Sequence, residues 1–344
     1  YLQAENLLKG TALASQLDVS QVHRRQADMY VVQGQTELAL KTYRHAKEEA
    51  RASIHAVALL DGRISSLLHI SGDTGGAVSL LRSAVDILKS SKEIDSILFV
   101  ELSAQLGNLE KTVGNSAQAA SLLKYTLTVV DALVEAQPAN QTLLELQASI
   151  ELDLGESLIN VEEIPQAVEQ LQRSVGAHEK LLNIDPENVR MQEKLAIAMR
   201  QLASAYSENG QIDLAIQSCQ KVIKQYREMR LQKTSNVATF GLANSLALLG
   251  NIQWFQGLAN ESAISYKEAT DLLNILAKED TDDISLLAAV AKTTVRYVEA
   301  VGKASGDPEQ STVLMIPQLE LLKSLSTSNP ENIELRKAII SVHT

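Results

Sequence analysis

Two short motifs in this sequence have the spacing of known catalytic or phosphate-binding sites. Ser218 and Lys221 fit S-x-x-K, in which some hydrolases place a nucleophile and its base. The stretch 71–76 is glycine-rich, as phosphate-binding loops are, but it lacks the Gly-Lys-Ser/Thr ending and no strand precedes it. The companion motifs of the hydrolases are also missing. We therefore interpret the first motif as helix surface and the second as a turn.

Metal-binding and redox chemistry find equally little support in the sequence. The six histidines form no H-x-x-x-H motif and adjoin no cluster of carboxylates, so we interpret them as isolated packed or surface residues: His23, His45, His55, His69, His178 and His343. Residues 280–283 are acidic but lack the glycine and the bidentate glutamate of a calcium loop. Cys219 is the only cysteine, which excludes an intrachain disulfide and a four-thiolate site. We expect no catalytic residue, no cofactor and no metal, and hence no enzyme.

The composition favours a large helical protein that does not bind polyanions. The 344 residues are 45% hydrophobic and only 3% aromatic, with a net charge of −11. An acidic chain is poorly suited to nucleic acids or anionic membranes, both of which favour a basic surface. No apolar run reaches the length of a membrane span. The sequence does not decide between a cytoplasmic and an extracytoplasmic location.

A repeated break organises the chain. Each break, usually a glycine, is followed five residues later by alanine or serine: Gly34/Ala39, Gly72/Ala77, Gly114/Ala119, Glu162/Ala167, Gly210/Ala215 and Gly257/Ser262. Nine residues after each break come Tyr43, Leu81, Leu123, Leu171, Cys219 and Tyr266. Small residues at fixed offsets indicate two antiparallel helices that approach closely after a turn. The chain is therefore predicted to be all-α, built of helix–turn–helix units.

A second marker recurs in phase with the first. Asn140, Asn188, Asn236, Asp283 and Asn332 are spaced by 48, 48, 47 and 49 residues, and three of them stand in Pro-x-Asn. Proline ends the preceding helix, and asparagine or aspartate caps the next one by accepting a backbone N–H. These positions are predicted to begin the first helix of each unit.

The pattern resembles the tetratricopeptide repeat (TPR) family. Tyr30, Gly34, Ala39, Tyr43 and Ala46 match its signature best, and residues 202–215 follow closely. The resemblance covers roughly residues 20–282 and implies an α-solenoid superhelix of stacked helix pairs. Units of up to about 48 residues exceed the family's usual 34, so the helices should be longer than usual. Such long units with Pro-x-Asn junctions look like the arrays that follow the kinase domain of bacterial Ser/Thr protein kinases.

We divide the chain into about seven TPR-like helical hairpins over residues 18–331, flanked by a helix remnant of an upstream repeat at 1–17 and the start of a further first helix at 332–344. The predicted hairpins are 18–53, 54–92, 93–139, 140–187, 188–235, 236–282 and 283–331. Both ends look cut, and the chain is expected to continue or to be covered by another chain.

The resemblance implies a function in binding. TPR proteins usually bind partners in the groove lined by the first helices, where the candidates are Arg24, Arg63, Asn108, Lys111, Glu156, Arg200, Ser204, Asn251 and Trp254. Asn108 and Asn251 occupy the asparagine position of the family's carboxylate clamp, but the paired Lys and Arg residues of that clamp are absent. Trp254 is either inter-repeat packing or a peptide hot spot.

The sequence leaves two functions open. The first is a non-catalytic protein–protein interaction scaffold that binds a protein or peptide in its groove. Such a scaffold could be the sensor or docking region of a larger bacterial signalling protein. The alternative is a structural protein that self-assembles, as a filament or surface layer, through homotypic contacts between uncapped ends.

Overall fold

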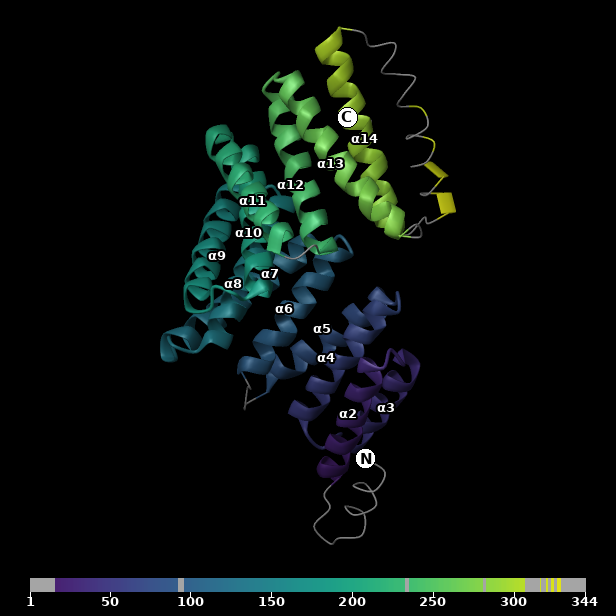
Figure 1. The fold of residues 1–344 in the computed structure, drawn as a ribbon. Helices are drawn as coiled ribbons and strands as arrows, with labels where there is room; N and C mark the ends of the chain where they lie inside the picture. The colour runs from purple at the N-terminus through teal and green to yellow at the C-terminus, as the bar shows by residue number, and fades with distance from the viewer. Residues whose placement is uncertain are drawn as a thin grey trace. The chain divides into compact units, whose positions relative to one another are not determined.

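A computed structural model describes residues 16–91, 96–232, 235–280 and 283–306, with residues 316, 320, 323–324 and 327–328. This part of the chain contains thirteen α-helices and no strand, which confirms the all-α prediction (Figure 1). The chain divides into two compact units, residues 1–161 and 162–344. No helix in the described part combines the length and apolarity that crossing a bilayer requires.

The first unit contains seven described helices, each packed on the next along the chain. They are α2 (Gln16–Val32), α3 (Thr36–Glu49), α4 (Ile54–Ile70), α5 (Thr74–Ser90), α6 (Ser96–Thr112), α7 (Ser116–Ala136) and α8 (Gln141–Asn160). Alternate helices also touch, α4 with α6 and α6 with α8. Neighbour-on-neighbour packing of this kind is typical of a solenoid.

The second unit repeats this arrangement with six described helices. They are α9 (Ile164–Ile184), α10 (Val189–Glu208), α11 (Ile212–Gln232), α12 (Asn236–Phe255), α13 (Ala259–Glu279) and α14 (Ile284–Ser305). Successive helices pack on one another, and α10 also touches α12. From α7 to α14 the helices have 20–22 residues, against 14–17 for α2 to α6. A strict 48-residue period stays a prediction.

The seam between paired helices lies where the small residues predicted it. All six residues five positions after the breaks, from Ala39 to Ser262, are fully buried. Ser262 replaces alanine, and its Oγ donates to the carbonyl oxygen of Gly250 at 2.9 Å. A Cβ added at Gly107 would lie 2.7 Å from the side chain of Leu123, so the backbones approach too closely for anything larger. Close packing therefore explains the spacing of the small residues.

The breaks themselves are left-handed turns. The five break glycines have φ between 71° and 91°, a conformation that other residues adopt at a cost. At the sixth break Glu162 takes the same conformation, with φ of 63°, and is the only described non-glycine residue with positive φ. The chain therefore adopts a left-handed turn at this break even though the sequence has no glycine there.

The predicted caps hold at three of the four junctions that the structure describes. The side chains of Asn140, Asn188 and Asp283 accept from the backbone N–H three residues on, at 3.3, 3.1 and 3.0 Å. The prediction for Asn236 was wrong, because α12 begins at that residue and Ser235 holds the cap position. Asn236 instead donates to Glu279 Oε2 at 3.1 Å. Asn332 lies outside the described residues.

The division into hairpins stays a prediction. Of the predicted remnant 1–17, only residues 16 and 17 are described, and they belong to α2. Most of the second half of 283–331, and all of 332–344, lie outside the described residues.

Candidate peptide-binding groove

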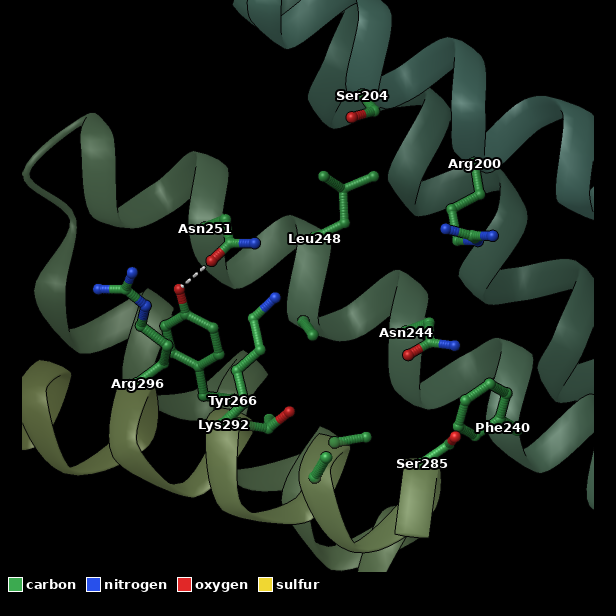
Figure 2. Close-up of a pocket in the computed structure, with 14 residues that line it drawn as sticks. Arg200, Ser204, Phe240, Asn244, Leu248, Asn251, Tyr266, Ser285, Lys292 and Arg296 are labelled. Atoms are coloured by element: carbon green, nitrogen blue, oxygen red, sulfur yellow. Dashed lines mark hydrogen bonds between the residues drawn. The ribbon is translucent and has the colours of Figure 1, made fainter. Parts of the chain in front are cut away.

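The second unit contains a cavity of about 500 Å³ that is lined mainly by the first helix of each successive hairpin. Its walls come from α10, α12 and α14, with Tyr266 contributed by α13 (Figure 2). The lining residues that matter below are Arg200, Ser204, Phe240, Asn244, Leu248, Asn251, Tyr266, Lys292 and Arg296. We call this cavity the groove.

The charged side chains of the groove are all cations. Arg200 comes from α10, Lys292 and Arg296 come from α14, and none of the fourteen lining residues is acidic. Arg296 pairs with Glu299 at 3.0 Å, but Glu299 does not line the groove. In a chain of net charge −11, this is a locally positive surface. It favours an anionic ligand.

Amide groups stand beside these cations along α12. Asn251 Oδ1 accepts a hydrogen bond from the phenol of Tyr266 at 2.6 Å (Figure 2). Burial raises the pKa of Tyr266 to about 12, so the phenol stays protonated at neutral pH and can donate. The bond fixes the amide of Asn251, and Asn244 lies two turns earlier on the same helix. Amides that both donate and accept suit the main chain of an extended peptide.

The first unit repeats the tyrosine contact with a different partner. Tyr43 donates to Asp28 Oδ1 at 2.5 Å, across the same interval of fifteen residues. Burial raises the pKa of Tyr43, while the charges of Arg24 and Arg63 act to lower it. These two predicted groove residues therefore lie around one phenol, with Arg24 half-buried and Arg63 exposed.

Lys111, another predicted groove residue, is held by carboxylates of the same unit. Its Nζ lies 2.9 Å from Asp153 Oδ1 and also contacts Glu156, both on α8. Burial alone would lower the pKa of Lys111, but the two carboxylates outweigh it and raise that pKa. Lys111 and Glu156 thus join α6 to α8, and the nearby Asn108 is exposed.

Trp254 contacts a residue of α14 but remains partly accessible to solvent. Its ring is half-buried, and Lys303 Nζ of α14 lies 4.4 Å from the ring centroid, a cation–π contact between α12 and α14. Trp254 does not line the groove, whereas Arg200, Ser204 and Asn251 do. The structure thus brings three of the predicted residues together in one cavity.

Sequence reasoning missed Phe240, Asn244, Lys292 and Arg296. A signal was present: Asn244 and Asn251 are seven residues apart, while Lys292 and Arg296 are four apart, as are Arg200 and Ser204. Both spacings place side chains on one face of a helix. The sequence alone did not show which face of each helix lines the groove.

Ser218 and Lys221 of the S-x-x-K motif lie on α11, with Ser218 half-buried and Lys221 exposed. Cys219 next to Ser218 is fully buried, and burial raises the pKa of its thiol to about 12, which suppresses the thiolate. In the glycine-rich stretch, Asp73 caps α5 by accepting from the N–H of Gly76 at 2.8 Å. A carboxylate therefore occupies the position that a phosphate would take.

The expectation of isolated histidines was wrong for two of the six. The rings of His23 and His45 lie 4.6 Å apart, and both approach Glu49. The hairpin brings these residues together across 26 positions of sequence.

A family model for the tetratricopeptide repeat matches residues 198–228. No curated protein matches the sequence. Among solved structures, the chain is similar to the apo form of RapI, with 13% identity and a TM-score of 0.65 over 99% of this chain and 89% of RapI. It is also similar to aspartyl phosphate phosphatase F from Bacillus subtilis (12%, TM-score 0.60, 92% and 73% covered). A third similar structure is a Rap protein complexed with competence and sporulation factor (14%, TM-score 0.55, 95% and 80% covered). At these identities the likeness shows the fold alone.

Proposed function

We propose that this chain, in which residues 198–228 match a model of the tetratricopeptide repeat, is a non-catalytic interaction scaffold whose groove binds an extended, acidic segment of a partner protein. The observation that carries this proposal is the charge of the groove. Arg200, Lys292 and Arg296 line it without a single acidic neighbour among the lining residues.

The other lining residues support a peptide as the ligand. A cavity of about 500 Å³ lies within the usual range for ligand sites, about 300–1,000 Å³. Asn244 and Asn251 offer amides for the peptide main chain, while Phe240 and Leu248 offer apolar contacts. Acidic side chains of the peptide would be attracted by the positive charge of Arg200, Lys292 and Arg296.

The fold of the comparison structures is compatible with a binding role. A Rap protein of this fold has been solved in complex with competence and sporulation factor. That ligand belongs to the Rap protein and does not identify the ligand of this chain. A non-catalytic role is supported here by the buried, protonated thiol of Cys219 and by the capping role of Asp73.

The wider setting that we propose is the sensor or docking region of a larger bacterial signalling protein, such as a Ser/Thr kinase. It is motivated by the long units and the Pro-x-Asn junctions of the sequence. The full-length gene product tests it directly: a flanking catalytic or anchoring region supports the setting, and its absence removes it. The alternative, self-assembly through the ends of the array, predicts growth of the sedimentation coefficient with concentration.

Selection from a random peptide library with the full chain tests the groove. We expect enrichment of peptides with two or more acidic residues, whose affinity falls as salt increases. Replacement of two of the three cations, Arg200→Gln with Lys292→Gln, should weaken binding of the selected peptides at least about tenfold, or about 1.4 kcal/mol.

The matched control carries the same change of charge elsewhere in the second unit. Lys180→Gln with Lys221→Gln removes two exposed cations from α9 and α11, which do not line the groove. This control should bind as the wild type does. Equal weakening in both double variants, or selection without acidic enrichment, would contradict the proposal.

A further inference from the structure

His23, His45 and Glu49 form a cluster at one face of the α2–α3 hairpin, separate from the groove of the second unit. His23 Nδ1 lies 2.7 Å from Glu49 Oε2, and His45 Nε2 lies 3.6 Å from Glu49 Oε1. One nitrogen from each imidazole and one carboxylate oxygen all lie within 4.8 Å of one another. From this geometry we propose that the cluster binds a divalent first-row transition metal, with Zn²⁺ as the representative ion.

The donor set selects this class of ion. Two imidazole nitrogens with one carboxylate oxygen suit Zn²⁺, Co²⁺, Ni²⁺ and Cu²⁺, whereas Mg²⁺ and Ca²⁺ prefer sites made of oxygen alone. Three protein ligands with an open fourth position are an ordinary arrangement for zinc. The cluster therefore provides enough donors, with water able to complete a tetrahedron.

The elements that carry the ligands are held in place independently of a metal. His45 and Glu49 are one turn apart on α3, and His23 reaches them from α2. Beside them Ser20 Oγ donates to the carbonyl oxygen of Ala46 at 2.8 Å, which ties the same two helices together. Ala46 and its neighbours in the α2–α3 seam are fully buried. The backbone that positions the donors is thus part of the core.

The required rearrangement is small. Tetrahedral zinc with bonds of about 2.0–2.1 Å holds its ligand atoms about 3.4 Å apart. His23 and Glu49 already lie closer than this, so the ion would replace the hydrogen bond between them. His45 must move inward, and its side chain is 57% exposed, against 7% for His23. His45 is therefore the ligand that has to move, and it can change rotamer without disturbing the core.

A metal at this position would link α2 to α3 by coordination. The hairpin would then resist opening more strongly, because an ion that binds only the folded state stabilises it by RT ln(1 + c/Kd), where c is the free ion concentration. This role is independent of ligand binding in the groove. A hydrogen-bonded His–Glu pair with a neighbouring imidazole is the competing explanation, and it requires no metal.

Calorimetric titration of the full chain with ZnCl₂ separates the two explanations. We expect one equivalent to bind, and Co²⁺ to give the visible absorption of a four-coordinate site. Excess Mg²⁺ or Ca²⁺ should leave Zn²⁺ affinity unchanged. Thermal unfolding should shift upward in the presence of Zn²⁺.

The variants locate the site. His45→Ala alters the exposed ligand and is expected to fold, and it should weaken Zn²⁺ binding at least tenfold and abolish the thermal shift. Glu49→Gln should weaken binding as well. His69→Ala removes an exposed histidine from α4 and should leave both readouts unchanged. Absence of Zn²⁺ binding in the wild type, or wild-type affinity in His45→Ala, would overturn the proposal.

Discussion

The phenol of Tyr266 and the amide of Asn251 are joined by a 2.6 Å hydrogen bond, and the same interval of fifteen residues joins Tyr43 to Asp28 in the first unit. In both cases the second helix of a hairpin fixes a polar side chain on the first helix. The partner is an amide in the second unit and a carboxylate in the first. Asn251 lines the groove, whose charged lining residues are all cations, whereas Asp28 does not line it.

Tyr266→Phe is expected to lower both stability and peptide affinity. Loss of the hydrogen bond should cost about 0.5–1.5 kcal/mol in the free energy of unfolding, and it should free the amide of Asn251 to rotate. Denaturant melts and titration with a selected acidic peptide measure the two effects. Tyr43→Phe is the matched change; it should cost at least as much stability, because its acceptor is a carboxylate, and it should leave peptide affinity unchanged. Equal effects of both variants on affinity would argue against a binding role for Asn251.

Ala215→Leu should overpack the crossing of α10 and α11. Ala215 is fully buried at the seam, so the larger side chain is expected to cost about 1–3 kcal/mol. Gln217→Leu places the same leucine on the exposed face of α11 and should change stability little. Chemical unfolding of both variants gives the comparison, and an unaffected Ala215→Leu variant would mean that the seam lies elsewhere.

Glu162→Gly should stabilise the chain. Glu162 adopts the left-handed conformation of the break glycines, with φ of 63°, and a non-glycine residue there costs about 1 kcal/mol. The reciprocal change, Gly210→Glu, should destabilise by a similar amount. It meets no steric obstacle, because no neighbouring atom lies within 4 Å of a Cβ at that position. Opposite signs for the two variants are expected in thermal or urea unfolding, and equal signs would refute the backbone explanation.

His178 should make the chain less stable as the pH falls from 7 towards 5. Burial lowers its pKa, the bond from Nδ1 to the carbonyl oxygen of Ser174 opposes this, and the charge of Lys194 adds to the lowering. The unfolded chain therefore takes up the proton first, near pH 6.5. Below that pH the unfolding free energy falls by up to about 1.4 kcal/mol per pH unit until the folded-state pKa is reached.

Urea melts between pH 8 and pH 5 measure this dependence. His178→Gln should have a shallower slope than the wild type, whereas the exposed control His69→Gln should keep the wild-type slope. Identical slopes for wild type and His178→Gln would assign the acid sensitivity to other groups.

Much of the fold could be predicted because its determinants are local. The glycine breaks, the small seam residues and the Asn and Asp caps each act within one hairpin, so their spacing is visible in sequence. The prediction for Asn236 was wrong because α12 begins at Asn236 itself and Ser235, one residue earlier, holds the cap position; the Asn236 side chain donates to Glu279 instead. A repeat pattern in the sequence does not locate the start of a helix to within one residue.

The polar contacts between helices could not be predicted in this way. Lys111 has cationic chemistry suited to a groove, but its charge is taken up by Asp153 and Glu156 from the next first helix. His23 meets His45 and Glu49 only once α2 and α3 pair. Such contacts depend on which face each helix turns towards its neighbour.

Photo-crosslinking of a selected acidic peptide tests the location of binding most directly. Phe240 lines the groove on α12 and is 40% exposed, while Phe255, at the end of the same helix, is 81% exposed and does not line it. With p-benzoylphenylalanine at either position in the full chain, irradiation should join the peptide to position 240 and not to the more accessible position 255. Crosslinking at 255 with none at 240 would contradict binding in the groove.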